Sequence, residues 1–477
     1  MKQKPIDAVI IGSGPNGLSA AIRLAQQGFE TQIVEAKNTI GGGMRTAELT
    51  LPGFFHDICS AAHPMGILSP FFRTLPLQEH GLTWIQPPAS VAHPMPDGSA
   101  VMLWKSLQKT MDELEQDGPA YSKLISPFLK NPHGLLGDIL GPLSIPKHPI
   151  QMIRFGLKAI RSATGLANSS FRHPRAKALF AGCAGHAILP LEHMLTAALG
   201  LVFSLTGHVE EWPVAKGGSA SIAKALADYF TSLGGTIRTN THVRSLDDLP
   251  PAKVILFDTS PKQLQQIAAN HLPTRYKNRL QKYHYGPGVF KLDWALREPI
   301  PWSDKRCLQA STVHVGGTME EISLSERQMW NGKHQERPFL LVCQQSLFDQ
   351  SRAPAGQHTG YAYCHTPANS TVDMTAAIEN QIERFAPGFT DTILARHKMN
   401  CQDFSAHNPN YIGGAITGGV ANIWQAFSRP VARLNPYTTP NPKLFICSAS
   451  SPPGGGVHGM CGFYAAQAAI KRLHKAN

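Results

Sequence analysis

The sequence is short of charged residues, and shorter of acids than of bases. Only 16% of its 477 residues are Asp, Glu, Lys or Arg, and 42% are apolar, a globular composition with little ionic surface. An extensive apolar cavity would produce this shortage, and so would a compact protein with few ion pairs. The formal net charge of +12 is accompanied by no groove-reading motif, so we expect no nucleic acid partner.

Several motifs are also missing. None of the eight cysteines forms a CxxC pair, and none of the 21 histidines lies in an HExxH motif, which argues against zinc ribbons, dithiol sites and a resident metal. The longest apolar run, residues 194–205, is too short to span a bilayer. A strand pattern begins almost at residue 1, leaving no room for a signal peptide. We therefore expect a cytoplasmic location.

Glycine is concentrated in two distant segments, Gly12-Ser13-Gly14-Pro15-Asn16-Gly17 and residues 451–460. The first follows an apolar run, residues 8–11, and opens a helical pattern over residues 18–27. A second strand pattern, residues 31–34, ends in Glu35, where an acid can bind a ribose hydroxyl. This order predicts a dinucleotide site, because glycine admits the pyrophosphate to the N-terminus of the helix.

The residues after Glu35 bear on the choice between nicotinamide and flavin. Ala36 is followed by Gly41-Gly42-Gly43-Met44-Arg45, a second flexible loop just past the ribose position. A simple nicotinamide fold needs no such loop. No second GxGxxG follows a strand pattern, so we expect no separate nicotinamide domain.

The order of these motifs, with Pro52-Gly53-Phe54, residues 212–219 and the late Pro-Pro-Gly-Gly-Gly-Val-His-Gly, resembles the FAD-dependent oxidoreductases related to phytoene desaturases. More distantly, it resembles the monoamine oxidases. The resemblance covers essentially the whole chain. It implies an extended, noncovalently bound FAD, with its adenine end at the N-terminal motif and its isoalloxazine beside the C-terminal glycines.

The resemblance also implies the cofactor-binding residues. They are Gly12, Ser13, Gly14, Pro15, Asn16, Gly17, Glu35, Ala36, Gly41, Gly42, Gly43, Met44, Arg45, Val243, Ser448, Gly456, Val457, His458, Gly459 and Met460. One departure is visible, because Cys447-Ser448-Ala449 stands where the family commonly carries a glycine.

The implied fold class is α/β, with a Rossmann-like FAD-binding domain of the two-dinucleotide-binding flavoprotein type. We expect this domain to comprise residues 1–85, 215–265 and 425–477. An interleaved α+β substrate domain would comprise residues 86–214 and 266–424. We detect no internal repeat.

Two residues are candidates for catalysis beside the flavin. His458 opens the terminal helix pattern, whose N-terminus could stabilise negative charge on the reduced ring; an ordinary helix start is the other interpretation. Lys291 alternates with Phe290 and Leu292 along a strand pattern. The alternation alone favours a solvent-facing Lys291 beside Asp293, whereas the resemblance to monoamine oxidases implies a lysine near the flavin.

Four further polar residues are weaker candidates. His56, Asp57 and His63 follow the Pro52-Gly53-Phe54 motif, and His186 lies in a run of Gly and Ala. His56, Asp57 or His63 could accept a proton, and histidine is well suited to that role near neutral pH; a capping or core role is the alternative for each of these three. His186 could line the substrate cavity, and close helix packing is the alternative for its surroundings.

A basic stretch stands out in the middle of the chain. No Asp or Glu occurs between Asp138 and Glu192, and the cations there are Lys147, Arg154, Lys158, Arg161, Arg172, Arg175 and Lys177. Ile150, Ile153, Leu157 and Ile160 share one helical face. The stretch, residues 147–177, could contact an anionic membrane, dock a phosphate-bearing partner, or form a solvated face.

We interpret the chain as an FAD-dependent oxidoreductase that removes a hydride and a proton from an apolar small-molecule substrate, such as an isoprenoid or an acyl chain. The electron acceptor would be oxygen, a quinone or a nicotinamide. The alternatives are a flavin-dependent amine oxidase, an isomerase without net redox change, and an FAD-containing binding protein.

Overall fold

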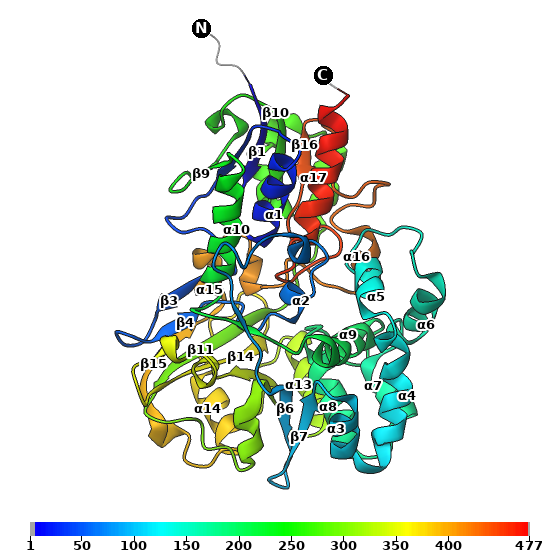
Figure 1. Cartoon of the computed structure of the whole chain (residues 1–477), viewed down its shortest axis with the longest axis vertical. Coiled ribbons are helices and arrows are strands. Elements are labelled where there is room, and N and C mark those ends of the chain that lie inside the picture. Colours follow the sequence, from blue (N-terminus) through cyan, green and yellow to red (C-terminus); the bar gives the residue numbers. More distant parts are fainter. Residues whose placement is uncertain (1–4, 476–477) are drawn as a thin grey trace.

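A five-stranded parallel sheet forms the upper part of the molecule in Figure 1, in the computed structural model, which describes residues 5–475. Its order is β16-β10-β1-β2-β9, and every neighbouring pair is parallel. Its strands are β1 (Ile6–Ile11), β2 (Thr31–Val34), β9 (Thr236–Arg238), β10 (Ala252–Phe257) and β16 (Leu444–Ile446). Both ends of the chain and its middle therefore meet in one sheet, and the predicted α/β class is confirmed.

Helices cover both faces of this sheet. Ala8 and Ile10 pack with α1 (Pro15–Ala25), α10 (Ala220–Ser232) and α17 (Met460–Leu473). Val9 and Ile11 pack on the other face with α11 (Pro261–Ile267) and α12 (Thr274–Gln281). Because both faces are buried, β1 is continuously apolar rather than alternating.

A mixed seven-stranded sheet forms the lower part in Figure 1, with the order β15-β11-β14-β13-β12-β6-β7. Only the β12 and β6 pair is parallel. The strands are β6 (Ala89–Pro94), β7 (Ala100–Trp104), β11 (Gly288–Leu296), β12 (Ala310–Val315), β13 (Leu340–Cys343), β14 (His358–Thr366) and β15 (Ile393–Met399). Two short pairs, β3 (Thr46–Glu48) with β4 (Phe55–Asp57) and β5 (Trp84–Ile85) with β8 (Val214–Ala215), lie apart from the two large sheets.

The remaining helices pack around the second sheet. On one face, α14 (Thr375–Glu383) covers Phe290, Leu292 and Trp294. Beside the sheet, a helical cluster shares one apolar core with β6 and β7. The cluster comprises α3 (Leu107–Glu113), α4 (Gly118–Leu129), α5 (Pro132–Ile139), α6 (Pro149–Ala159), α7 (Ala163–Ser170), α8 (Pro174–Gly185), α9 (Thr196–Val209) and α13 (Met319–Trp330). Three short helices are α2 (Pro64–Ile67), α15 (Cys401–His407) and α16 (Ile423–Ser428).

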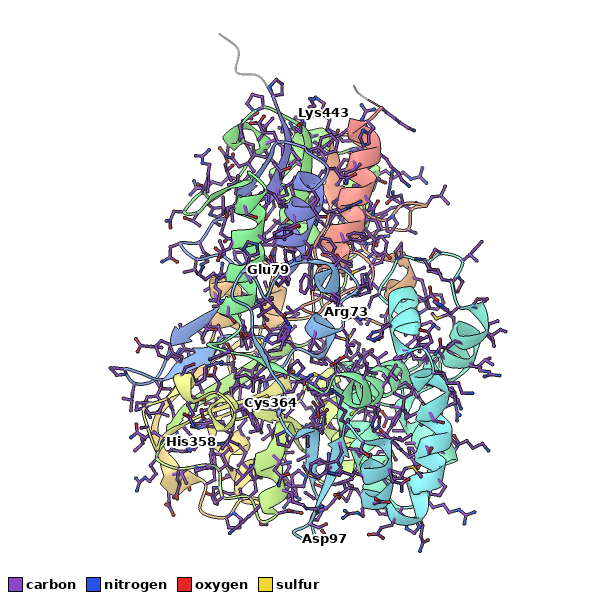
Figure 2. All side chains as sticks on the ribbon, viewed as in Figure 1. Arg73, Glu79, Asp97, His358, Cys364 and Lys443 are labelled. Atoms are coloured by element: carbon purple, nitrogen blue, oxygen red, sulfur yellow. The ribbon has the colours of Figure 1, made fainter. Side chains whose placement is uncertain are left out.

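Every strand of the parallel sheet lies inside the ranges predicted for the FAD-binding domain, and every strand of the seven-stranded sheet lies outside them. The exact domain boundaries stay a prediction, and residues 1–4 and 476–477 lie outside the described residues. Figure 2 shows Lys443, just before β16, at one end of the molecule and Asp97, in the β6–β7 turn, at the other. No helix within residues 5–475 is long and apolar enough to cross a membrane.

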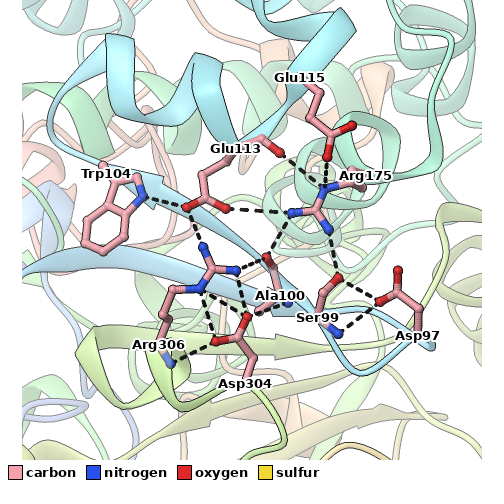
Figure 3. A network of polar contacts seen from close by, with 9 residues as sticks. All are labelled: Asp97, Ser99, Ala100, Trp104, Glu113, Glu115, Arg175, Asp304 and Arg306. Atoms are coloured by element: carbon pink, nitrogen blue, oxygen red, sulfur yellow. Dashed lines mark hydrogen bonds and ion pairs between the residues drawn. The ribbon is translucent and has the colours of Figure 1, made fainter.

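One arginine of the predicted basic stretch belongs to a structural network (Figure 3). Arg175 donates to Ser99 Oγ at 2.8 Å and to the Ala100 carbonyl at 3.1 Å, and it pairs with Glu113 at 3.7 Å. Arg306 meets the same Glu113 carboxylate at 2.7 Å. Arg175 therefore fastens α8 to the β6–β7 hairpin and to α3, and we exclude it from the surface that is free to bind a partner.

Candidate functional site

One elongated cavity connects the two large sheets. The volume of the cavity is about 1990 Å³, and this figure includes open solvent at its mouth. One end lies where β1, β2 and β10 finish, and the other is walled by β12, β13, β14, α8 and α9. Residues of both glycine-rich segments line it, including Gly12, Gly14, Gly456 and Val457. The two segments are thus brought to one cavity, as predicted.

The first glycine segment forms a tight cradle after β1. Gly12 has φ of +102°, a conformation that favours glycine. A Cβ on Gly14 would lie 2.6 Å from a carboxylate oxygen of Asp258. Helix α1 begins at Pro15, which has no N–H, so its first backbone donors are the N–H groups of Asn16 and Gly17 at this cradle. The local sequence therefore builds an anion site of the kind that a pyrophosphate requires.

Asp258 lies in this cradle, and we did not predict it. Its Oδ2 accepts a hydrogen bond of 2.9 Å from the Gly17 N–H. Burial, together with the nearby Glu35 charge, raises the pKa of Asp258 to about 8, although hydrogen bonds from Gly17 and Gly14 oppose the rise. A signal was present in the sequence, because Asp258 directly follows β10 and parallel neighbours end at the same edge of a sheet.

Glu35 is buried at the end of β2 and lines the cavity. One carboxylate oxygen accepts from Ser13 N at 3.0 Å and Ser13 Oγ at 2.6 Å. The other accepts from Lys37 N at 2.9 Å and Arg45 Nη2 at 3.3 Å. Glu35 therefore fastens the glycine cradle to the second glycine loop, in addition to facing the predicted ribose position.

The cavity fits an extended dinucleotide such as FAD. The side-chain oxygens of Asn16 and Thr259 are buried and have no protein partner, and both residues line the cavity. A buried polar atom without a partner is costly, so a bound ligand would satisfy these two. Of the predicted cofactor residues, fourteen line the cavity: Gly12, Ser13, Gly14, Pro15, Asn16, Glu35, Ala36, Gly42, Gly43, Arg45, Val243, Ser448, Gly456 and Val457.

Six predicted cofactor residues do not line it: Gly17, Gly41, Met44, His458, Gly459 and Met460. Met44 and Met460 instead belong to the core between the parallel sheet and its helices. Gly459 has φ of +69°, and a Cβ there would lie 2.6 Å from the Phe72 ring. Close packing at the start of α17 accounts for Gly459 and Met460, and the predicted cofactor contacts of the six residues stay a prediction.

His458 lies at the start of α17, and the predicted role of this helix start beside the flavin stays a prediction. Its Nδ1 accepts the Met460 N–H at 3.0 Å, and its carbonyl accepts from Ser69 Oγ at 2.6 Å. The ring is buried, and burial lowers its pKa to about 4. His458 therefore holds the start of α17, which corresponds to the ordinary helix-start interpretation.

Lys291 is buried, so the solvent-facing interpretation is wrong. Its ammonium group pairs with Asp293 and lies 4.5 Å from the centre of the Tyr361 ring. Tyr361 lines the cavity, and Lys291 does not. Lys291 thus lies behind the cavity wall, with His56 and His397 near the same Asp293 carboxylate at 3.6 and 3.5 Å.

The four weaker candidates for proton transfer or cavity lining differ in whether they reach the cavity. His63 and His186 line the cavity, whereas His56 and Asp57 do not. Asp57 forms a buried ion pair with Arg352 at 2.8 Å. His63 Nδ1 has no protein partner, and burial lowers the pKa of this imidazole to about 4.

The end of the cavity beside the seven-stranded sheet carries no Asp, Glu, Lys or Arg. Its lining is aromatic, aliphatic or neutral: Ala61, Ala62, His63, Pro64, Met65, Gly66, His186, Phe203, Trp212, Thr312, Leu341, Cys343, Tyr361 and Tyr363. The His186 ring centre lies 4.4 Å from that of Phe203. We call this region the apolar end. No group of three or more potential metal ligands lies together within residues 5–475.

A row of histidines begins at the apolar end. His186 Nε2 lies 3.0 Å from His314 Nε2, so one ring donates to the other. Burial lowers the pKa of His186 to about 3 and lowers that of His314 as well. Both rings are therefore neutral near neutral pH. We did not predict His314, which belongs to a strand far from His186 in the sequence.

The comparisons with known proteins agree with this geometry. Residues 10–75 match the NAD(P)-binding Rossmann-like domain family. Pyridine nucleotide-disulfide oxidoreductase domain-containing protein 2 of Rattus norvegicus is 24% identical, covering 98% of this chain and 94% of that protein. Hydroxyneurosporene desaturase of Cereibacter sphaeroides is 30% identical over 24% of this chain and 23% of its own length.

Solved structures share the fold across the chain. An oxidoreductase from Methanosarcina mazei has a TM-score of 0.67 at 15% identity, covering 98% of this chain and 100% of that one. Putrescine oxidase, solved with putrescine bound, has a TM-score of 0.62 at 17% identity, covering 98% and 99%. With desaturase-like and amine oxidase-like proteins among its relatives and neighbours, the chain is an FAD-dependent oxidoreductase.

Proposed function

We propose that this oxidoreductase is phytoene desaturase-like and dehydrogenates an apolar substrate, such as an isoprenoid or an acyl chain. The observation that best supports this proposal is the composition of the apolar end, where no charged side chain lines the cavity. A charged substrate group placed there would lose its hydration without a compensating partner. An apolar chain would instead gain from leaving water.

The residues of the chain would divide the work between the two ends. The glycine cradle, Asn16 and Glu35 would hold FAD, which when bound supplies the two-electron redox chemistry. Phe203 and Trp212, whose ring centres lie 5.1 Å apart, would orient the substrate and exclude water. His186 would accept the proton that leaves the substrate, because it lines the apolar end with a neutral imidazole, although a pKa lowered to about 3 makes that imidazole a weak base.

An amine oxidase is the second candidate. Tyr361 and Tyr363 line the apolar end with ring centres 6.0 Å apart and planes at 86°, and aromatic faces attract ammonium groups. The fold neighbour putrescine oxidase acts on an amine. Against this candidate, the lining acids Glu35 and Asp258 both lie at the dinucleotide end, so no carboxylate is available to an ammonium at the apolar end.

Anaerobic mixing of purified holoprotein with a polyene, a long acyl chain or a long-chain amine tests these assignments. We expect flavin absorbance to bleach with one of the first two and not with the amine. Substrate conversion without bleaching would indicate the isomerase. Tight binding without conversion would indicate an FAD-containing binding protein.

The His186 assignment has its own test. His186→Gln should slow bleaching by about 10²-fold, the lower end of the usual contribution of a general base, because the lowered pKa makes this imidazole a weak base, while FAD content stays normal. His193→Gln, at an exposed position, is the matched control. Equal bleaching rates in His186→Gln and wild type would remove His186 from the reaction.

We also propose a cytoplasmic location. All eight cysteines are free, and seven of them are buried. A chain with this many unpaired thiols suits a reducing compartment. Fractionation of cells that express the tagged full chain would test this proposal, and recovery from an oxidising compartment would contradict it.

A further inference from the structure

Helix α6 turns its apolar side outward. Ile150, Ile153 and Leu157 are 70%, 63% and 70% exposed, while only Phe155 and Ala159 of this helix are buried. An amphipathic helix of a globular protein normally buries its wide apolar stripe. In α6 the stripe that the sequence predicts therefore has no covering element within the described residues.

The exposed apolar surface continues on both sides of α6. Leu143 and Ile145, in the segment before the helix, are 73% and 94% exposed, and Ile160, just after it, is 43% exposed. We call these residues the docking face: Leu143, Ile145, Ile150, Ile153, Leu157 and Ile160. Single exposed aliphatic residues are ordinary, but six in eighteen consecutive positions mark an interaction site.

Cations without acidic partners accompany the docking face. Within residues 5–475, no carboxylate pairs with the side chains of Lys147, Arg154 or Lys158. The nearest acid in the sequence, Asp138, accepts instead from the backbone N–H groups of Lys147 and His148, at 2.9 and 3.0 Å. The face therefore joins exposed aliphatic side chains to uncompensated positive charge.

We propose that the docking face binds an anionic lipid surface, with α6 lying in the plane of the interface. Aliphatic side chains would enter the acyl boundary, and Lys147, Arg154 and Lys158 would meet lipid phosphates. Charge complementarity selects this occupant over a second copy of the same chain, because two such faces would bring like charges together. The inference goes beyond the proposed function and does not depend on it.

Helix α12 offers a matched comparison within the same molecule. It also carries cations, and Arg275, Arg279 and Lys282 on or beside it are exposed. Its apolar residues Tyr276 and Leu280, however, are buried. Helix α12 therefore has the charge of α6 without the exposed apolar side.

Sedimentation of the holoprotein with vesicles tests the proposal. Wild type should bind phosphatidylglycerol-containing vesicles at low salt and far less to pure phosphatidylcholine vesicles. Replacing the cations (Lys147→Gln, Arg154→Gln, Lys158→Gln) should weaken binding about a hundredfold, at roughly one kcal/mol per surface cation. Replacing the apolar residues (Ile150→Ser, Ile153→Ser, Leu157→Ser) should weaken it at least about tenfold.

The α12 variant (Arg275→Gln, Arg279→Gln, Lys282→Gln) should bind vesicles like wild type, and all variants should retain FAD. Equal loss in the α6 and α12 charge variants would overturn the proposal, because it would indicate nonspecific attraction. Complete competition by soluble glycerol phosphate would reassign the site to a phosphate-bearing ligand. A lipid-free dimer that the serine variant abolishes would assign the face to self-association instead.

Discussion

Asp258 places its carboxylate at the N-terminus of α1, where Oδ2 accepts a 2.9 Å hydrogen bond from the backbone N–H of Gly17. Residues of this region would bind the pyrophosphate of FAD, so an ionised Asp258 would repel it. Burial, reinforced by the charge of Glu35, raises the pKa of Asp258 to about 8, and the carboxyl is therefore protonated near neutral pH.

We predict that FAD affinity falls as the pH rises past about 8, because Asp258 then gains a negative charge. Asp258→Asn keeps the acceptor for Gly17 and should flatten this dependence. The raised pKa also affects folding without FAD. The contribution of Asp258 to the free energy of unfolding is greatest below about pH 4 and is lost as the pH rises toward 8. Fluorescence titration of deflavinated protein with FAD on both sides of pH 8 measures the effect. Parallel pH profiles for the two proteins would contradict the role of Asp258.

Glu35→Gln should weaken FAD binding by about 1.5 to 3 kcal/mol, or roughly ten- to a hundredfold. The amide cannot accept both from Ser13 on one side and from Lys37 and Arg45 on the other, so the glycine cradle loosens as well as the ribose contact. Glu30→Gln, at an exposed position just before β2, is the control. Unchanged affinity in Glu35→Gln would show that neither contact matters for binding.

Lys291→Met should destabilise the protein by about 3 to 5 kcal/mol, because it leaves the buried Asp293 carboxylate without its partner. The double variant Lys291→Met/Asp293→Leu should recover most of this loss. Lys398→Met, on the neighbouring strand β15, removes a surface pair with Asp373 and should cost no more than about 1 kcal/mol of unfolding free energy. Urea unfolding measures all three.

The same lysine can be tested for a redox role. Tyr361 stands between Lys291 and the cavity, so stopped-flow reoxidation of the reduced double variant by oxygen should match wild type. A clear change in the reoxidation trace would return Lys291 to the reaction, as the resemblance to monoamine oxidases implies.

The buried pair of Asp57 and Arg352 should make the protein sensitive to acid. Burial alone would raise the pKa of Asp57, but Arg352 and hydrogen bonds from Ser219 and Thr46 outweigh it and hold the pKa below its usual value. This stabilisation is complete above about pH 4 and is lost as the pH falls further. Arg352→Met should cost about 3 to 5 kcal/mol at neutral pH.

The loss of unfolding free energy caused by Arg352→Met should be smaller in acid, because Asp57 becomes neutral there in the variant. Urea midpoints of wild type and variant at neutral and acidic pH give this difference. Arg384→Met, which removes a partly exposed pair with Glu321, should show a small cost at both values. A constant gap between wild type and Arg352→Met would mean that the charge of Asp57 is not what Arg352 compensates.

The sequence predicted the features that depend on a few neighbouring residues. The glycine cradle after β1 and the acid after β2 follow from local backbone needs, and both were placed correctly. The alternation of Phe290 and Leu292 was also correct. The burial of Lys291 was not predictable from alternation, because the face that Lys291 shares with Val289 is covered by Ile58, Phe404 and Tyr411, which are distant in the sequence.

Periodicity identified the shared face of Ile150, Ile153 and Leu157 but could not say whether another element covers it. The lining of the apolar end was equally inaccessible, because residues such as Phe203 on α9 and Leu341 on β13 meet only in the folded chain. Asp258 was within reach and was missed, since the carboxyl ends of neighbouring parallel strands meet at one edge.

The position of β16 and α17 late in the sequence determines when during synthesis the FAD site can be completed. Strand β16 closes the edge of the parallel sheet beside β10, and α17 packs along α1. On the ribosome, the first glycine segment emerges more than four hundred residues before this closing piece. The nascent chain therefore lacks part of the cavity wall until the residues around β16 and α17 have emerged, and stable FAD loading must await them.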